Sequence, residues 1–209
     1  MLWSNLPRTH VGFKFLHGGA LLTLESLIPV ALLKISRAQR AFEFGTYTGA
    51  TTRLLLENLH GTQNLVTTLD LPSLDGIEFE GGDLRLAAES LDGEREYRRS
   101  AKQKQVKQLL MDSMTFEVSG YEESFGLVFV DGNHKLEYLR CDSDNAFELV
   151  ANDGCIAWHD YGNPEFPELT DFLNDLSSRH VLYHVEETML CFYLPGRSLP
   201  ESIGRKAKN

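Results

Sequence analysis

The sequence predicts an α/β fold, a doubly wound and mostly parallel sheet that ends in an antiparallel strand pair. Strand-like and helix-like segments alternate along the chain, which is typical of parallel sheets with helices on both faces. Segment 125–130 is a continuous apolar run, as expected for a strand that is covered on both faces. Segments 181–185 and 189–194 are joined by a turn of only three residues, which indicates a hairpin.

Composition is consistent with one domain and limits the partners of the chain. Of its 209 residues, 42% are hydrophobic and 24% are charged, as in an ordinary globular protein. The formal net charge of -10 repels nucleic acid and anionic membranes, so we expect neither as a partner and expect a small-molecule substrate instead. The three cysteines are far apart and odd in number, which indicates a reducing compartment and a cytoplasmic location.

The N-terminal segment, residues 1–36, is predicted to be a helical cap. We assign no chemistry to His10 or His17 in its first part. Ala20 to Ser36 is predicted to be helical, kinked or restarted near Pro29. The run is too short to span a bilayer, and its apolar residues could serve as the interface of a homo-oligomer. The main domain is expected over residues 37–195 and a flexible tail over 196–209.

A glycine turn follows the first predicted strand, Ala41 to Phe44. Gly45 and Gly49 lack a Cβ, so the backbone can approach a ligand closely, and the N–H groups of the next helix, Thr51 to Leu59, would face that ligand. The spacing G-x-x-x-G differs from the G-x-G-x-x-G of nicotinamide-binding folds, and no Lys-Ser or Lys-Thr follows to make a P-loop. Glycine turns also occur without a ligand, so this turn alone does not establish a binding site.

The second predicted strand, Leu65 to Leu69, ends in Asp70, roughly 20 residues after the glycine turn. An acid at this place holds the ribose hydroxyls of a nucleoside in related folds, whereas the alternative is a turn-forming Asp. The polar segment 72–105 comes next, with one short helix predicted around Leu84 to Ser90. Excursions of this length are functional lids or are disordered.

The remaining strands also end in polar residues. Val106 to Met111 precedes Asp112, the apolar run 125–130 precedes Asp131, and Cys155 to Trp158 precedes His159 and Asp160. Helices are predicted between the last two of these strands, ending at the turn 152–154, and over Phe166 to Leu176. In doubly wound sheets ligands bind beyond the carboxyl ends of the strands, so these tips are expected to form one site.

Taken together, these motifs resemble the class I S-adenosylmethionine-dependent methyltransferases. More specifically, the sequence resembles the small bacterial group whose fourth- and fifth-strand motifs read D-G-x-H and H-D-Y. The matching segments, in order, are Glu43 to Gly49, Asp70, Asp112-Ser113, Phe129 to His134 and Trp158 to Tyr161. One departure is Asp153-Gly154, which stands in for a usual pair of glycines before the fifth strand. The resemblance implies a Rossmann-like sheet of seven strands whose terminal pair is antiparallel.

The resemblance also implies a cofactor and its contacts. S-adenosylmethionine would lie on residues Glu43, Gly45, Thr46, Tyr47, Thr48, Gly49, Asp70, Leu71, Asp112, Ser113 and Asp131. Related oxygen methyltransferases bind a divalent cation at the tips of the fourth and fifth strands, which here carry Asp131, His159 and Asp160. Mg²⁺ prefers oxygen ligands, and the His moves preference toward Mn²⁺ and other transition metals. The alternative is that His159 and Asp160 hold the loop by hydrogen bonds.

Catalysis would then rest on His134 and Asp131. His134 is the best candidate for a general base because it closely follows Asp131 beyond a strand tip, and a structural hydrogen bond is its alternative role. The predicted function is S-adenosylmethionine-dependent O-methylation of a small molecule, with or without a divalent metal. The alternatives are an NAD(P)-dependent oxidoreductase on the same architecture and a non-catalytic protein that binds S-adenosylmethionine.

Overall fold

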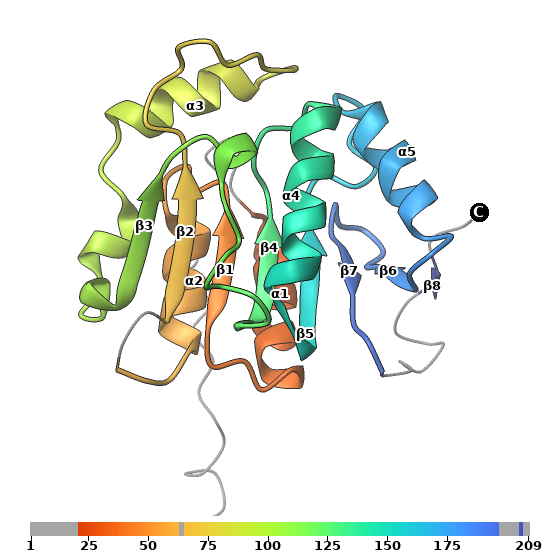
Figure 1. The fold of residues 1–209 in the computed structure, drawn as a ribbon, viewed down its shortest axis with the longest axis horizontal. Coiled ribbons are helices and arrows are strands. Elements are labelled where there is room, and N and C mark those ends of the chain that lie inside the picture. Colours follow the sequence, from red (N-terminus) through yellow and green to blue (C-terminus); the bar gives the residue numbers. More distant parts are fainter. Residues whose placement is uncertain (1–20, 63–64, 197–204, 207–209) are drawn as a thin grey trace, which may run out of the picture.

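The computed structural model describes residues 21–62, 65–196 and 205–206 of the chain (Figure 1). The strands are β1 (Ala41–Phe44), β2 (Val66–Asp70), β3 (Val106–Leu110), β4 (Phe125–Val130), β5 (Val150–Trp158), β6 (Leu182–His184), β7 (Cys191–Tyr193) and β8 (Arg205–Lys206). The helices are α1 (Thr23–Ile35), α2 (Ala50–Asn58), α3 (Asp83–Asp92), α4 (Leu136–Leu149) and α5 (Pro167–Leu176). Three short 3₁₀ turns complete the order, namely η1 (Glu96–Arg99), η2 (Gln103–Gln105) and η3 (Ser113–Thr115).

One sheet joins all of these strands in the order β3-β2-β1-β4-β5-β7-β6-β8. The five strands β1 to β5 are parallel to one another, and β7 runs antiparallel to both β5 and β6. The doubly wound, mostly parallel fold with an antiparallel C-terminal pair is thereby confirmed. The short strand β8 pairs with β6 as an eighth strand, which the sequence did not predict. It lies in the segment that was expected to be a flexible tail.

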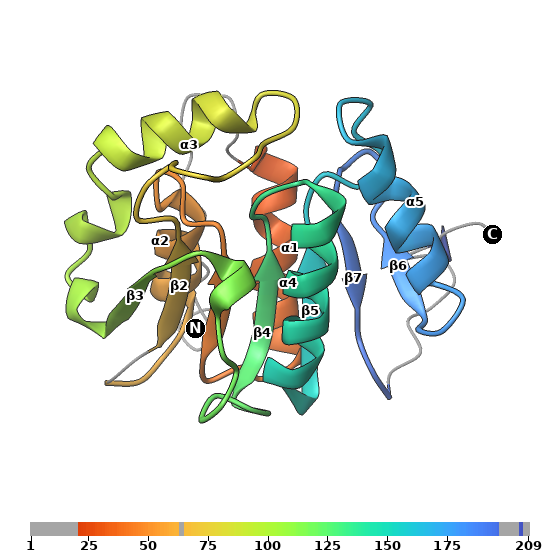
Figure 2. The ribbon, with the colours of Figure 1, turned by 45° about the horizontal axis from the view of Figure 1, so that its top comes forward.

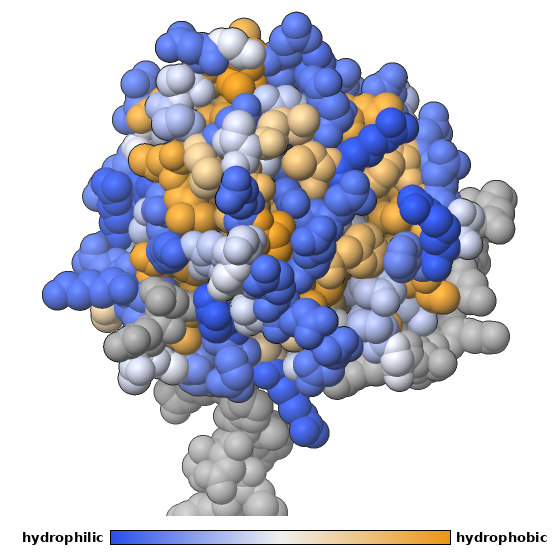
Figure 3. All heavy atoms as spheres, in the orientation of Figure 1, coloured by the Kyte–Doolittle hydropathy of each residue, from blue (hydrophilic) through white to orange (hydrophobic). Residues whose placement is uncertain are grey.

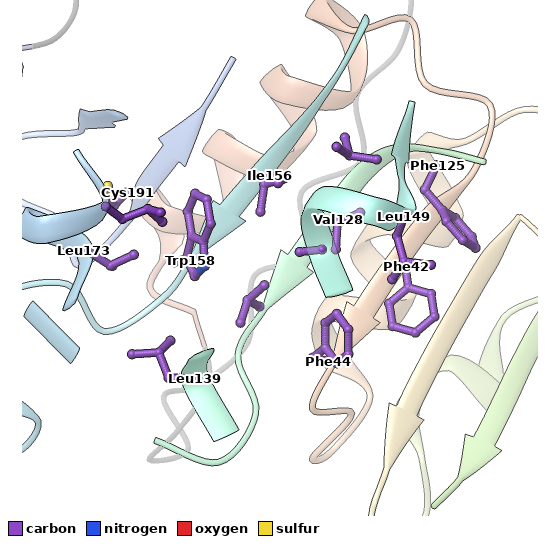
Figure 4. Close-up of a cluster of buried hydrophobic side chains, with 14 of the residues drawn as sticks. Phe42, Phe44, Phe125, Val128, Leu139, Leu149, Ile156, Trp158, Leu173 and Cys191 are labelled. Atoms are coloured by element: carbon purple, nitrogen blue, oxygen red, sulfur yellow. The ribbon is translucent and has the colours of Figure 1, made fainter. Parts of the chain in front are cut away.

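Helices cover both faces of the sheet (Figures 1 and 2). Residues alternate between the two faces along each strand, so Phe42 and Val128 join a core with α4 and α5, whereas Leu127 and Phe129 join a core with α1 and α2. Figure 4 shows the first of these cores, where Trp158 lies fully buried near Leu139 and Leu173. A strand buried on both faces explains why segment 125–130 is apolar throughout.

Two predicted boundaries change in the structure. Helix α1 runs as one helix through Pro29 and does not restart there, because its neighbours Val30, Leu32 and Leu33 are buried on the sheet side. The turn predicted at 152–154 lies inside β5 as an irregularity of the strand, where the register against β4 shifts. Gly154 is needed there, since a Cβ at this position would lie 2.9 Å from the carbonyl oxygen of Phe125.

The polar segment 72–105 forms α3, η1 and η2 and is not disordered. In both ribbon views α3 crosses above the carboxyl ends of β1 and β2 (Figures 1 and 2). No α3 residue belongs to either described core cluster. The helix therefore covers the edge at which the polar strand tips meet, without being part of the hydrophobic interior.

The outer surface is largely hydrophilic on the face shown in Figure 3, with hydrophobic residues in separate groups. Leu24 and Leu27 of α1 are among the exposed large hydrophobic side chains. Self-association through this helix stays a prediction, as do the boundaries of the cap, the main domain and the tail. Residues 1–20, with His10 and His17, lie outside the described part. Among the described helices none is long and apolar enough to cross a membrane.

Candidate functional site

The glycine turn after β1 brings the backbone of two strand ends into close contact. Gly45 has a φ of +87°, and a Cβ on it would lie 1.9 Å from the carbonyl oxygen of Asp131. Any side chain there would push β1 and β4 apart, so this position requires glycine. Gly49 has a φ of +74°, and a Cβ there would lie 2.9 Å from the ring of Tyr97. The second glycine thus makes room for a residue of η1.

Glu43 lies behind this turn and has no exposed surface. Its Oε2 accepts hydrogen bonds from the hydroxyls of Thr52 (2.5 Å) and Thr68 (2.7 Å). Oε1 has no hydrogen-bond partner among the described residues. Burial raises the pKa of Glu43 to about 8, because a charged carboxylate loses its hydration there, although both hydroxyls favour the charged form. Glu43 supports the turn from within the core.

Asp70, at the end of β2, is held by residues of the polar segment. Its Oδ2 accepts a hydrogen bond from Ser90 Oγ (2.8 Å) and pairs with Nη2 of Arg95 (2.9 Å). Its Oδ1 accepts the backbone N–H of Leu71 at 3.0 Å. Burial raises the pKa of Asp70, and the contacts with Ser90 and Arg95 oppose that rise. Arg95 also donates to the carbonyl oxygen of Tyr47 in the glycine turn.

Asp112 and Ser113 follow β3 and face helix α4. Tyr138 donates its hydroxyl to Oδ2 of Asp112 at 3.3 Å, while the backbone N–H of Met114 bonds Oδ1. Asp142 is 1% exposed, and its Oδ1 lacks a hydrogen-bond partner within the described chain. Burial raises the pKa of Asp142 to about 7, against a hydrogen bond from Ser113.

A cavity of about 530 Å³ lies over these strand ends, between the sheet edge, α3 and the start of α1. The predicted site residues that line it are Gly45, Tyr47, Asp70, Leu71, Ser113, Asp131, His134, His159 and Asp160. The predicted residues outside its lining are Glu43, Thr46, Thr48, Gly49 and Asp112. The cofactor contacts of all these residues remain predictions.

Two imidazoles and a set of carboxylates meet at one end of this cavity. His134 contacts Asp83 through Nδ1 (2.9 Å) and Asp160 through Nε2 (3.0 Å), and its ring stacks on Phe166 with centroids 4.0 Å apart. His159 contacts the same oxygen of Asp160 through Nδ1, at 2.9 Å.

The outer contacts of His159 involve two further carboxylates. Its Nδ1 lies 3.4 Å from Asp131 Oδ1, and its Nε2 lies 3.5 Å from Glu25 Oε2. Glu25 comes from α1, is 1% exposed and also accepts the backbone N–H of Met189 at 2.9 Å. Burial would raise the pKa of Glu25, but the His159 contact and backbone hydrogen bonds lower it.

The protonation of the two imidazoles is set by their acidic neighbours. Burial would lower the pKa of His134, but the hydrogen bonds to Asp160 and Asp83 outweigh it and raise the pKa to about 10. Burial likewise opposes the charged form of His159, and Asp131 and Asp160 raise its pKa well above the usual value. The pKa of Asp160 is lowered by both imidazoles in spite of burial. The acidic neighbours therefore favour the charged form of both rings.

One group of potential metal ligands stands out within the described residues. Asp131, His134 and Asp160 each offer one ligand atom, and these atoms lie within 4.8 Å of one another. Asp160 has a φ of +62°, a rare backbone conformation that Asp tolerates better than most residues. The ligand set predicted from the sequence shares Asp131 and Asp160 with this group and has His159 as its third member. His134, predicted to be a base, has carboxylates at both ring nitrogens.

The sequence analysis did not identify several charged residues of the site, among them Glu25, Asp83, Arg95 and Asp142. Glu25 looked like an interruption of an apolar helix, and Asp83 and Arg95 lie among many charged residues of the polar segment. Their partners are 134, 51 and 25 residues away along the chain. One available signal was a lone acid within the otherwise apolar α1, since such a group is buried only with partners.

Comparisons with known proteins agree with this geometry. A family model described as a methyltransferase domain matches residues 42–161, which is more than half of the chain. A search of curated proteins finds no match.

Solved structures share the fold at low sequence identity. The O-methyltransferase TomG from Streptomyces achromogenes, involved in tomaymycin synthesis and solved with S-adenosylmethionine, has a TM-score of 0.57 and 16% identity over 85% of this chain and 82% of its own. An O-methyltransferase from Bacillus cereus in complex with S-adenosylhomocysteine has a TM-score of 0.58 and 14% identity over 85% and 84%. A Podospora anserina methyltransferase bound to S-adenosylhomocysteine has a TM-score of 0.54 and 17% identity. The match covers 83% of this chain and 79% of that protein's chain.

Proposed function

The chain belongs to the methyltransferase domain family, and from this premise we propose that it transfers the methyl group of S-adenosylmethionine to an oxygen atom of a small molecule. The observation that carries the proposal is one cavity that joins two kinds of site. Asp70 lies in its lining beside the glycine turn, and Asp131, His134 and Asp160 lie together in the same lining. The first part suits a nucleoside, and the second suits a hydroxyl that must lose its proton.

The proposed reaction is a displacement at carbon. The acceptor oxygen forms a bond to the methyl carbon while the bond from that carbon to sulfur breaks, which leaves S-adenosylhomocysteine and a methyl ether. The protein aligns the two reactants in the cavity. Holding the reacting atoms about 3 Å apart contributes much of the rate enhancement. The hydroxyl proton must also leave, to solvent water or to a basic side chain, because a neutral alcohol or phenol is a weak nucleophile.

The donor set fits a divalent cation. Glu25, Asp83, Asp131 and Asp160 supply four carboxylates around two imidazoles, so even with both rings protonated the cluster is more negative than positive. A divalent cation bound by Asp131 and Asp160 would lower the pKa of an acceptor hydroxyl. Two carboxylates with one imidazole suit Mn²⁺ better than Mg²⁺.

We propose His134 as the third ligand, with Asp131 and Asp160. The grouping of these three ligand atoms within 4.8 Å supports this choice. His159 is the rival third ligand, and its contact with Glu25 suits a supporting role instead. Both roles of His134 require an Nε2 without its proton, and the raised pKa of that ring opposes this. A bound cation would displace that proton, whereas a base has to lose it before the reaction, so the ligand role is favoured.

The function is tested by calorimetric titration with S-adenosylhomocysteine, with NAD as the comparison ligand. We expect micromolar binding of the former and none of the latter. Asp70→Asn should weaken this binding by about 1–3 kcal/mol, since an amide has only one oxygen to accept hydrogen bonds from the two ribose hydroxyls, whereas a carboxylate has two. Asp75→Asn, an exposed change a few residues along, is the control. Binding of NAD alone would replace the proposal by an oxidoreductase.

Activity and metal dependence are separate readouts of the same protein. Transfer of a labelled methyl group is assayed over a panel of catechols, phenols and sugars, with Mn²⁺, with Mg²⁺ and with a chelator. Binding without transfer to any acceptor would favour a non-catalytic protein. Replacing His134 or His159 by Ala then separates the two ligand sets, because loss of a ligand should lower Mn²⁺ affinity more than loss of a residue that only positions a ligand.

A further inference from the structure

Helix α3 is fastened to the two halves of the cavity by its two ends. At its start, Asp83 contacts His134, and at its end Ser90 donates to Asp70. We propose that Asp83 is a positioning residue that couples cation binding at Asp131, His134 and Asp160 to the docking of α3 over the cavity. This inference rests on the metal site of the proposed function and adds a residue and a coupling to it.

The contacts of Asp83 are those of a group that orients an imidazole. Asp83 is 7% exposed, its two carboxylate oxygens lie 2.9 Å from Nδ1 of His134, and Oδ2 also accepts the backbone N–H of that residue at 3.1 Å. A carboxylate at Nδ1 keeps the proton on that nitrogen, which leaves Nε2 as the atom that can bind a cation. Phe166 stacks on the ring with an interplanar angle of 11° and fixes its plane.

The direction of Nε2 completes the argument. It points to Oδ2 of Asp160 at 3.0 Å, within the group that includes Asp131. A cation bound there would displace the proton of Nε2, bind its lone pair and fix the ring in place, while Nδ1–H stays hydrogen-bonded to Asp83. The same contact would therefore hold α3 more firmly in the loaded protein than in the free protein.

Helix α3 is held by polar contacts and not by the hydrophobic core, with Glu78 bonded to Asn133 just before it and Glu89 bonded to Tyr47. None of its residues is part of a described core cluster, and Leu84 and Leu91 are 55% and 41% exposed. Leu86 and Ala87 face the cavity, so they contact a ligand when one is bound. An element held by a few polar contacts opens at low cost, which suits a helix that must let ligands enter.

The first test measures Mn²⁺ affinity by electron paramagnetic resonance of the free ion, without cofactor or acceptor. Asp83→Asn should raise the Kd by 10- to 100-fold, the usual range for a group that orients a metal ligand. Asp92→Asn removes the same charge from the exposed end of the same helix and should leave the Kd within twofold. Equal affinities of the Asp83→Asn protein and the wild type would overturn the inference.

The second test measures amide hydrogen exchange of residues 83–92 in the wild-type protein, so it does not depend on a variant that folds. Mn²⁺ should slow this exchange at least threefold, and the Asp83→Asn protein should lose that response while β4 and β5 keep their protection. Unchanged exchange in α3 of the wild type with bound Mn²⁺ would refute the coupling. Absence of Mn²⁺ binding to the wild type would instead refute the metal site itself, and the role of Asp83 with it.

Discussion

Glu43 links the stability of the fold to pH at the scale of a single residue. Its pKa is about 8 in the folded protein and near 4.5 in an ordinary setting, because burial disfavours the carboxylate. Between these values the unfolded chain loses the proton and the folded chain keeps it. Ionisation thus favours unfolding, so this contribution to stability is complete below pH 4.5 and is lost as the pH rises toward 8.

Glu43→Gln should remove this pH dependence, because an amide of the same shape can accept from Thr52 and Thr68 but cannot ionise. Relative to the wild type, the variant should gain about 1.4 kcal/mol per pH unit within that window. Urea unfolding at pH 5 and pH 8 measures the gain. Glu148→Gln, an exposed change, is the control. If the stability of the variant and of the wild type changes equally with pH, the buried acid is not the cause.

Residue types at strand tips were predictable, and their partners were not. Asp70, Asp131 and Asp160 were found because parallel strands end at one edge, so position along the chain gives position in space. Glu25 and Asp83 were missed because they come from helices whose docking brings them to that edge. Both imidazoles contact acids of this cluster, and which of them would be the third cation ligand depends on side-chain directions that the sequence does not give.

At the scale of elements, the polar segment 72–105 shows how a poorly patterned sequence can be ordered. Few apolar residues anchor it, so periodicity indicated only a short helix. In the structure, buried polar contacts hold it in place, above all those of Arg95 with Asp70, Ser90 and the carbonyl oxygen of Tyr47. Hydrogen bonds of this kind leave no periodic pattern in a sequence.

Arg95→Met should therefore destabilise the protein by about 3–5 kcal/mol, because it leaves the carboxylate of Asp70 buried without its charge partner. Both side chains of the pair are largely buried, with 8% and 15% exposed. Arg98→Met changes an exposed arginine of η1, which begins directly after Arg95, and should have little effect. Chemical unfolding monitored by circular dichroism measures both. Equal stability of the two variants would show that the segment is held by other contacts.

At the scale of the whole molecule, the fold was predictable from alternation alone. Strand–helix order leaves few ways to build a right-handed, doubly wound sheet, so the parallel pairing of these strands was predictable, whereas their order across the sheet was not predicted. The hairpin of β6 and β7 followed from its short turn. Strand β8 could not be foreseen, because two basic residues near a chain end carry no strand signal.

Because one sheet carries the whole cavity, ligand binding should stabilise the entire fold. S-adenosylhomocysteine at about 100 times its Kd adds about 2.7 kcal/mol to the stability. For a domain of this size, that corresponds to a rise in Tm of roughly 5–10 °C. NAD at the same concentration should give no rise, and Asp70→Asn should reduce the response to S-adenosylhomocysteine.

Mn²⁺ offers a second, independent ligand in the same thermal measurement. Its proposed ligands follow β4 and β5, whereas Asp70 ends β2, and only Asp131 is expected to contact both bound species. Their effects on Tm should therefore at least add when both are present, and the sum should fall in Asp160→Asn to the effect of S-adenosylhomocysteine alone. A combined rise no larger than that of the stronger ligand alone would mean that the two compete for one place, against a cavity that holds both.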